Sequence, residues 1–178
     1  MVGVDLRLET LDFRVLGAVS VDAPRGAIEL GGTKQRVLLA LLLLHPNESV
    51  SRDRVIDLLW SDKPPEKANN SLHVQVSKLR KALGSNRIGT DRAGYFLRIE
   101  EDELDLNVFR RLVARAREAR RAGDATGAAE TLRDALSLWR DAPFADLRYE
   151  RGLATEIARL EEGEVGSPRG THRPLSRA

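Results

Sequence analysis

Residues 68–83 read ANNSLHVQVSKLRKAL, and apolar side chains recur along them at helical spacing. The recurring positions, at i, i+4, i+7 and i+11, are Leu72, Val76, Leu79 and Leu83. Such spacing gathers the four side chains on one side of an α-helix, the side that packs into a core. The stretch therefore predicts a helix over residues 68–83 with a single narrow buried stripe.

The rest of this helix surface is polar or basic, with one small apolar residue and no carboxylate. At about 100° per residue, the side chains that point away from the stripe are Asn70, Val74, Ser77, Lys78 and Lys81. The side chains on the flanks are His73 and Arg80 on one side, and Ser71 and Gln75 on the other. Cations and amides bond to base edges, and a small apolar side chain can contact a thymine methyl. This surface predicts a helix that reads DNA; the alternative is an ordinary amphipathic surface helix.

Basic residues gather around this helix, although the whole chain is nearly neutral. The 178 residues carry a formal net charge of +2 and 31% of them are charged, which does not by itself indicate a nucleic-acid partner. Between residues 62 and 98, by contrast, eight lysines and arginines accompany three acidic residues. A local surplus of positive charge is the electrostatic footprint expected where a protein meets the DNA backbone.

Several classes of site find no support in the sequence. The chain has no cysteine, which excludes disulfides and thiolate metal sites. Its histidines, His45, His73 and His172, are scattered without the spacing of metal ligands. The N-terminus lacks the apolar segment of a signal peptide, and the longest apolar run, residues 37–44, is too short to span a bilayer. We therefore expect a cytoplasmic protein without a metal site.

The sequence also predicts that the protein is not an enzyme. Residues 26–34, GAIELGGTK, partly match a phosphate-binding loop. Thr33 occupies the Ser or Thr position, but Gly32 stands where that loop needs Lys, and Lys34 comes too late. Serine and histidine occur without a local nucleophile motif. We expect no catalytic residue and no cofactor.

Local patterns predict the order of the remaining elements. Three short β-prone runs, residues 13–17, 19–22 and 27–30, predict a small antiparallel sheet. Thr33 is expected to cap a leucine-rich helix that ends near His45, and Ser51 to open a second helix that ends near Trp60. The helix over residues 68–83 comes third. Two further β-prone runs, 87–90 and 95–99, then predict a hairpin, with Gly94 where its turn needs glycine.

Strands, three helices and a hairpin, with DNA read by the third helix, describe a winged helix-turn-helix. Five blocks in this order also resemble the signatures of the OmpR-type DNA-binding domain. They are GGTKQRVLLALLLL (31–44), VSRDRVIDLLW (50–60), PP (64–65), SLHVQVSKLRKAL (71–83) and GYFL (94–97). The form they resemble most is that of the Streptomyces antibiotic regulatory proteins (SARPs), over residues 13–99. We therefore expect an α+β winged helix-turn-helix domain over residues 1–104.

An all-α segment is expected after this domain. Residues 107–122 and 126–139 predict two helices with small residues at their crossing, which resembles a tetratricopeptide unit. Leu132 and Leu136 are among the side chains expected to face inward. In SARP-like regulators a helical bacterial transcriptional activator domain begins here, and this one resembles a truncated form. Its predicted bounds are residues 105–162, and residues 163–178 are expected to be a disordered tail.

The face of the third helix and the resemblance together predict the contacts with DNA. The expected base-reading residues are His73, Val74, Ser77 and Lys78. The residues expected at phosphates or in the wing are Asn70, Gln75, Arg80, Lys81 and Arg92. The resemblance further implies an RNA polymerase contact in the loop between the second and third helices, at Asp62, Lys63 and Glu66.

The predicted function is that of a sequence-specific DNA-binding transcriptional regulator. The resemblance implies an activator of secondary-metabolite or similar genes, which recruits RNA polymerase in the bacterial cytoplasm at the nucleoid. It also implies that the protein binds direct repeats in double-stranded DNA and self-associates on them. The alternative is a protein-interaction module that uses its helical pair and has no specific DNA site. A nucleotide-dependent regulator is disfavoured by the incomplete phosphate loop.

Overall fold

The computed structural model describes residues 10–61 and 63–164. A first antiparallel sheet contains β1 (Asp12–Arg14), β2 (Ser20–Ala23) and β3 (Gly26–Ala27), in the order β1-β2-β3. It forms where the sequence predicts a sheet, with Phe13 opposite Val21 in the register and both side chains buried. The third strand is shorter than predicted and begins one residue earlier, because Gly26 and Ala27 are the residues in register with β2.

A second antiparallel sheet contains the predicted hairpin, β5 (Ile88–Thr90) and β6 (Gly94–Leu97), and a strand that the sequence did not predict, β4 (Val50–Ser51). The strand order is β4-β6-β5. Gly94 is required by β4 rather than by the turn. A Cβ at Gly94 would lie 1.8 Å from the carbonyl oxygen of Val50, so no side chain fits where the two strands meet.

Three helices pack against one another, namely α1 (Thr33–Leu44), α2 (Arg52–Trp60) and α3 (Ala68–Leu83). The centre of α1, residues 37–43, is buried on every side, as its leucine content predicts. The N-cap of α1 is Gly32 rather than Thr33, and the Gly32 N–H donates to Oε1 of Gln35 over 3.0 Å. Ser51 caps α2 as predicted, because its hydroxyl accepts the N–H of Arg54.

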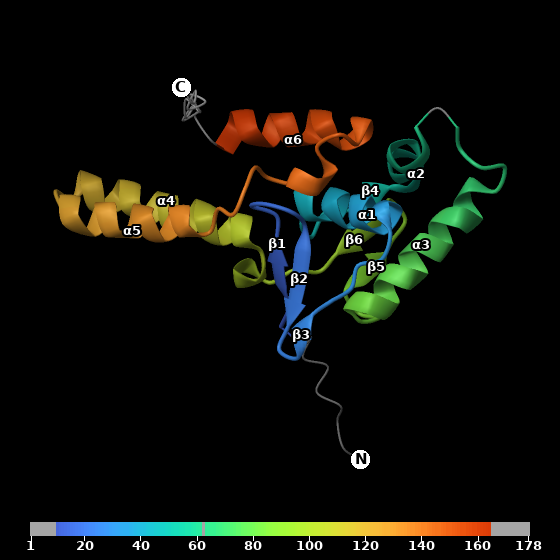
Figure 1. The fold of residues 1–178 in the computed structure, drawn as a ribbon, viewed down its shortest axis with the longest axis horizontal. Helices are drawn as coiled ribbons and strands as arrows, with labels where there is room; N and C mark the ends of the chain where they lie inside the picture. The colour runs from blue at the N-terminus through green and yellow to red at the C-terminus, as the bar shows by residue number, and fades with distance from the viewer. Residues whose placement is uncertain (1–9, 62, 165–178) are drawn as a thin grey trace, which may run out of the picture.

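The stripe of α3 is buried as its spacing predicts. Leu72, Val76, Leu79 and Leu83 are each 5% exposed or less, in one continuous core with α1 and α2. Val74, on the opposite side of the helix, is 50% exposed. The winged helix-turn-helix architecture expected from the sequence is therefore confirmed, and α3 lies at one side of it with its outer face uncovered (Figure 1).

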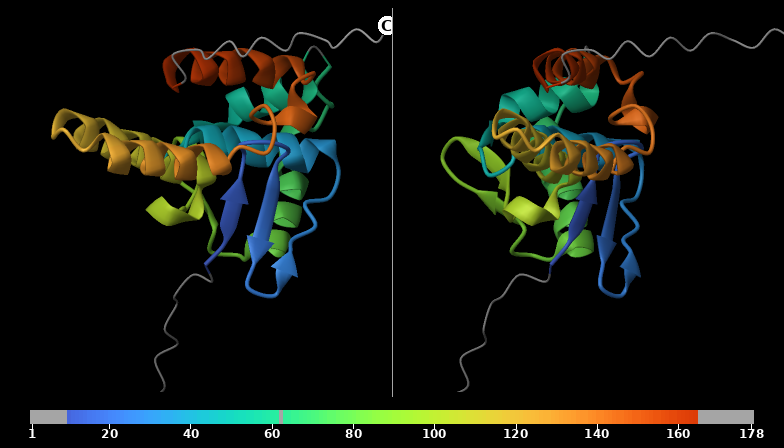
Figure 2. Two further views of the ribbon diagram at one scale, coloured as in Figure 1. Left: turned by 60° about the vertical axis from the view of Figure 1, so that its left-hand side comes forward. Right: turned by 90° about the vertical axis from the view of Figure 1, so that its left-hand side faces the viewer.

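Three further helices follow, α4 (Asp105–Arg121), α5 (Ala125–Ser137) and α6 (Arg151–Glu164). Helices α4 and α5 form a hairpin that projects from the body on the side away from α3 (Figures 1 and 2). Helix α6 packs against α2 and α1. The rest of the predicted tail, residues 165–178, lies outside the described residues. No helix in the described ranges combines the length and apolar character needed to cross a membrane.

The predicted inner face of α5 is partly wrong. Ala128 and Ala135 are buried, but Leu132 is 42% exposed and Leu136 is 63% exposed. Helix α5 packs almost entirely on α4, and this contact is made through the small alanines. The two leucines lie on the side of α5 that no described element covers.

The helical segment is joined to the first sheet by buried hydrogen bonds. The Asp105 carboxylate accepts the N–H groups of Val15 and Leu16 at 2.9 to 3.0 Å. The N–H groups of Arg140 and Phe144 donate back to the carbonyls of Leu16 and Val15, at 2.8 and 2.9 Å. These bonds hold the base of the α4–α5 hairpin against the strands, while its far end projects.

Candidate nucleic-acid interface

The four predicted base-reading residues, His73, Val74, Ser77 and Lys78, are all exposed on α3. Burial of the leucine and valine stripe fixes the rotation of the helix, so these side chains are left on its outer side. Asn70 and Lys81 are exposed beside them, and Gln75 is half-buried at the edge. The structure thus brings the predicted set together on one surface free of carboxylates.

One flank of α3 is tied to the hairpin by Arg80. Its Nε donates to the carbonyl of Ile88 over 2.9 Å, and its Nη2 donates to the hydroxyl of Thr90 over 2.8 Å. The guanidinium therefore links α3 to β5 and fixes the position of the wing. Arg80 thus supports the fold, and its phosphate contact stays a prediction.

The wing ends in a turn that Asp91 holds in shape. Its carboxylate accepts the hydroxyl of Ser49 and the N–H groups of Ala93 and Gly94, the latter two at 2.8 and 2.9 Å. These hydrogen bonds, with that from Ser49 the strongest influence, lower the pKa of Asp91 below its usual value. Arg92 is exposed at the tip of this turn, at the position from which the sequence predicts a minor-groove contact.

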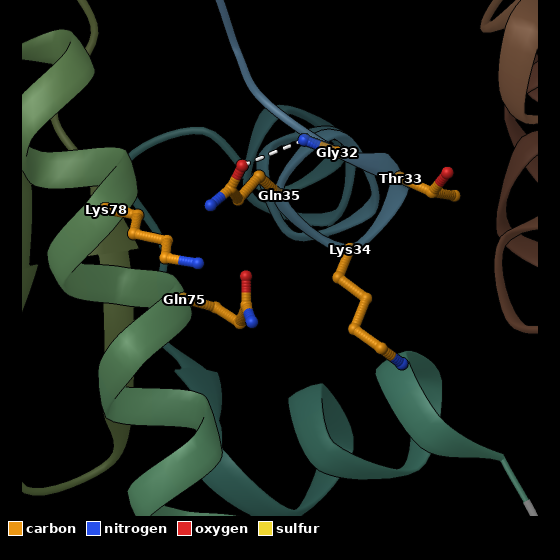
Figure 3. Close-up of a pocket in the computed structure, with 6 residues that line it drawn as sticks. All are labelled: Gly32, Thr33, Lys34, Gln35, Gln75 and Lys78. Atoms are coloured by element: carbon orange, nitrogen blue, oxygen red, sulfur yellow. Dashed lines mark hydrogen bonds between the residues drawn. The ribbon is translucent and has the colours of Figure 1, made fainter.

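On the other flank of α3, a hollow of about 300 Å³ separates the helix from the N-terminus of α1 (Figure 3). Its lining residues are Gly32, Thr33, Lys34, Gln35, Gln75 and Lys78. The set contains two lysines and no carboxylate. The side chain of Lys34 turns away, because its Nζ donates to the carbonyl of Leu59 over 2.8 Å and lies 4.9 Å from the centre of the Trp60 ring.

Two buried features that support this surface are not predicted from the sequence. Gln35 is buried beneath the hollow, and its signal was available as a Gln three residues after a helix N-cap. The buried pairing of Arg87 with Glu103 beneath the wing left no local signal, since 16 residues separate the two.

The predicted polymerase-contact loop connects α2 to α3. Lys63 and Glu66 are exposed there, and Asp62 lies outside the described residues. Nothing in the described part of the chain covers these two side chains, so the loop is accessible from solvent.

Two family models match the chain in sequence order. Residues 27–97 match the family described as "Transcriptional regulatory protein, C terminal", and residues 104–169 match the "Bacterial transcriptional activator domain". Regulatory protein AfsR of Streptomyces griseus is 34% identical over 131 residues, which cover 74% of this chain and 13% of AfsR. The combination of these two domains, together with this relative, indicates the SARP type.

The chain belongs to the SARP-type transcriptional regulators. This family consists of transcriptional regulators and not of enzymes. Regulatory protein DnrI of Streptomyces peucetius is 30% identical to this SARP-type chain over 144 residues, which cover 75% of the chain and 53% of DnrI.

A solved structure supports the arrangement of both domains. It is that of Mycobacterium tuberculosis EmbR in complex with a low affinity phosphopeptide. It matches 87% of the SARP-type chain and 42% of EmbR, with a TM-score of 0.81 and 32% sequence identity. The chain thus spans 13% to 53% of the length of these three proteins.

Proposed function

We propose that this SARP-type chain regulates transcription by binding double-stranded DNA at specific sequences, with α3 in the major groove. The observation that carries the proposal is the division of α3 into a stripe that is at most 5% exposed and an outer face without a carboxylate. A helix of this kind fits the major groove and meets no repulsion from phosphates.

The contacts divide by position on this surface. His73, Val74, Ser77 and Lys78 are proposed to read bases. Asn70, Gln75, Arg80, Lys81 and Arg92 are proposed at the backbone or in the wing, where they set the register of the protein on the duplex.

A binding-site selection on residues 1–178, followed by mobility-shift titration at two salt concentrations, tests the proposal. Specific binding should favour the selected duplex by about 10³-fold or more over a scrambled duplex. Affinity should also fall steeply between about 50 and 200 mM salt. A chain that selects no sequence and shows a flat salt dependence has no DNA function of this kind.

Two copies are proposed to bind side by side on direct repeats, because one reading helix contacts too few bases for strong selectivity. Repeats on one face of the duplex lie about 10–10.5 base pairs apart, centre to centre. Inserting half a turn between them should abolish cooperative binding, whereas a full-turn insertion should restore part of it. Equal cooperativity for both insertions would rule out the arrangement.

Activation is proposed to depend on a contact between RNA polymerase and the loop that carries Asp62, Lys63 and Glu66. Target genes for secondary metabolism, and action in the bacterial cytoplasm at the nucleoid, are proposed with it. Lys63→Glu and Glu66→Lys should reduce transcription from a promoter that holds the selected site while leaving DNA affinity unchanged. Unchanged transcription from both variants would remove the loop from this role.

One observation favours the alternative of a protein-interaction module. Leu132 and Leu136 are exposed on α5, and exposed apolar side chains that lie together often mark an interface. The two functions are compatible, because α5 and the outer face of α3 lie on different sides of the molecule (Figure 1). The selection experiment separates them, because only the first requires a preferred DNA sequence.

A further inference from the structure

The hollow beside α3 has the composition of an anion site. It lies between the first turn of α1 and the flank of α3 that carries Gln75 and Lys78 (Figure 3). Thr33 and Lys34 are exposed on the α1 side, and Lys78 is exposed on the α3 side, so solvent reaches the hollow. No acidic side chain is among its lining residues.

Backbone donors are available on the α1 side. The first N–H groups of an α-helix have no acceptor within the helix, and the aligned peptide dipoles add positive charge at this end. Gln35 satisfies the Gly32 N–H, at the cap, but the N–H groups of Thr33 and Lys34 follow it in the open first turn. An anion that approaches this turn meets these donors together with the Lys78 ammonium.

The carboxamide of Gln35 supplies an independent indication of a ligand. Its side chain is about nine-tenths buried, with 9% of the residue exposed. Oε1 accepts the Gly32 N–H over 3.0 Å, which fixes the orientation of the amide because only the oxygen can accept. Nε2 then projects into the hollow toward Lys78 (Figure 3), and no acceptor for it lies within the described ranges. This N–H group reaches the solvent of the hollow, because it is not among the fully buried side-chain atoms that lack a partner, and it is therefore free to donate to a ligand there.

We propose that this hollow binds one backbone phosphate of DNA, through the N–H groups of Thr33 and Lys34, Nε2 of Gln35 and Nζ of Lys78. The proposal rests on the proposed function. It moves Lys78 from a base edge to the backbone, and leaves His73, Val74 and Ser77 to read bases. DNA is the source of the phosphate because the hollow opens beside the outer face of α3, where a helix in the major groove has a backbone strand alongside.

This phosphate contact and the wing would hold the two flanks of α3 to the DNA backbone. Lys78 and Gln75 stand on one flank of α3, and Arg80 ties the opposite flank to β5 and so to the turn that carries Arg92. A helix held to backbone on both flanks has a fixed depth and tilt in the groove. Base contacts from the outer face then acquire a defined register.

Two variants test the site on the whole chain. Gln35→Glu keeps an oxygen to accept the Gly32 N–H and replaces the Nε2 donor with negative charge. Lys78→Gln removes the ammonium from an exposed side chain. The matched controls, Ala129→Glu and Arg133→Gln, make the same charge changes at exposed positions of α5. Affinities are measured for the selected duplex, for a scrambled duplex and for selected duplexes carrying one neutral methylphosphonate at each successive position.

A phosphate site predicts that Gln35→Glu and Lys78→Gln weaken binding to both unmodified duplexes by similar factors, on the order of tenfold, with both controls unchanged. Lys78→Gln should also reduce the slope of log affinity against log salt by about one unit. One methylphosphonate position should weaken binding of the natural chain and have little further effect on either variant. Equal thermal unfolding of Lys78→Gln and the natural chain excludes a folding defect.

Other outcomes overturn the proposal and leave the proposed function intact. If Lys78→Gln weakens the selected duplex alone and relaxes one base preference, Lys78 reads a base. If no methylphosphonate position loses its effect in the variants, the hollow holds no DNA phosphate. If DNA binding is normal in both variants, while inorganic phosphate or a phosphopeptide shifts the amide resonances of Thr33 and Lys34, the hollow serves another anion. Failure of the natural chain to bind DNA would instead refute the proposed function.

Discussion

Arg87 and Glu103 form a buried, two-bonded ion pair beneath the wing. Nη1 of Arg87 lies 2.6 Å from Oε2 of Glu103, and Nη2 lies 2.6 Å from Oε1. The two side chains are 2% and 4% exposed. Arg87 precedes β5, and Glu103 lies in the short 3₁₀ helix before α4 and also accepts the N–H of Leu11, 2.9 Å away. The pair therefore joins the wing, the N-terminal sheet and the start of the helical segment.

Removing one partner of this pair should destabilise the whole fold. Arg87→Met or Glu103→Gln is expected to lower the free energy of unfolding by about 3–5 kcal/mol, because the remaining buried group loses its partner. Urea denaturation followed by circular dichroism measures the loss. The double variant Arg87→Met, Glu103→Gln should lose clearly less than the sum of both single losses. Additive losses would show that the pairing itself contributes little.

Acid should weaken the fold through Glu103. Burial raises the pKa of this carboxyl, but the bonds from Arg87 and from the N–H groups of Glu100 and Leu11 outweigh burial, so its pKa lies below the usual value. A lowered pKa contributes stability above the unfolded value of about 4.3, and this contribution is lost as pH falls through the folded pKa. Urea midpoints should therefore fall on acidification, and less so for Glu103→Gln. Equal slopes for both proteins would contradict the assignment.

The contribution of Asp105 to folding stability should change with pH in the opposite direction to that of Glu103. Burial raises its pKa above the usual value, although Val15 and Leu16 donate to it. A raised carboxyl pKa means that the folded protein binds the proton more tightly, so acidification favours folding at this group. Asp105→Asn should thus lose stability more steeply with falling pH than the natural chain does. A shallower dependence for this variant would show that folding lowers the pKa of Asp105 instead.

Ser77 is expected to contribute sequence preference. Ser77→Ala should weaken binding to the selected duplex by about 1–3 kcal/mol and relax the preference at one base position, since a hydroxyl facing the groove bonds to a base edge. Repeating the selection with the variant measures both effects. Thr131→Ala on α5 serves as a control that should leave the selected sequence unchanged. A Ser77→Ala protein that selects the same site with full affinity would remove this residue from the readout.

Lys81 and Arg92 are expected to contact phosphates. Lys81→Gln and Arg92→Gln should each weaken all duplexes by similar factors and flatten the salt slope by about one unit. Arg80→Gln should do more, because its loss also breaks the bonds to Ile88 and Thr90 that hold the wing. Its melting temperature should drop, while those of the other two variants stay constant. An unchanged salt slope would mean that the tested cation is only solvated.

Hydrogen exchange should separate the far end of the helical hairpin from the body. Amides in residues 115–133 should exchange well before those of residues 37–44, because the end of the hairpin makes few contacts beyond itself whereas α1 is buried on every side. Amides in the first turns of α4, after Asp105, should exchange as slowly as those of the body, because this end of α4 is hydrogen-bonded to the first sheet. Uniform protection along α4 would show that the chain unfolds as one cooperative unit.

Local periodicity determined much of this protein. The spacing of Leu72, Val76, Leu79 and Leu83 fixes both the bounds of α3 and its buried side, since side chains four and seven residues apart share one side of a helix. Ser51 determines where α2 begins, because its hydroxyl bonds locally three residues ahead. The order of such elements sufficed to predict the winged helix and the surface proposed to face DNA.

Contacts between distant residues were decided only in the tertiary structure. Leu132 and Leu136 repeat at the spacing of a buried face, yet burial requires a neighbouring element, and none in the described chain covers that side of α5. Gly94 is predicted to serve a turn, but in the fold β4 brings the carbonyl oxygen of Val50 within 1.8 Å of the place that a Cβ would occupy. Periodicity reports which side of an element is apolar, whereas packing decides what meets that side. The hollow beside α3 also exists only in the folded protein. Its two walls come from α1 and α3, which are separate stretches of the sequence.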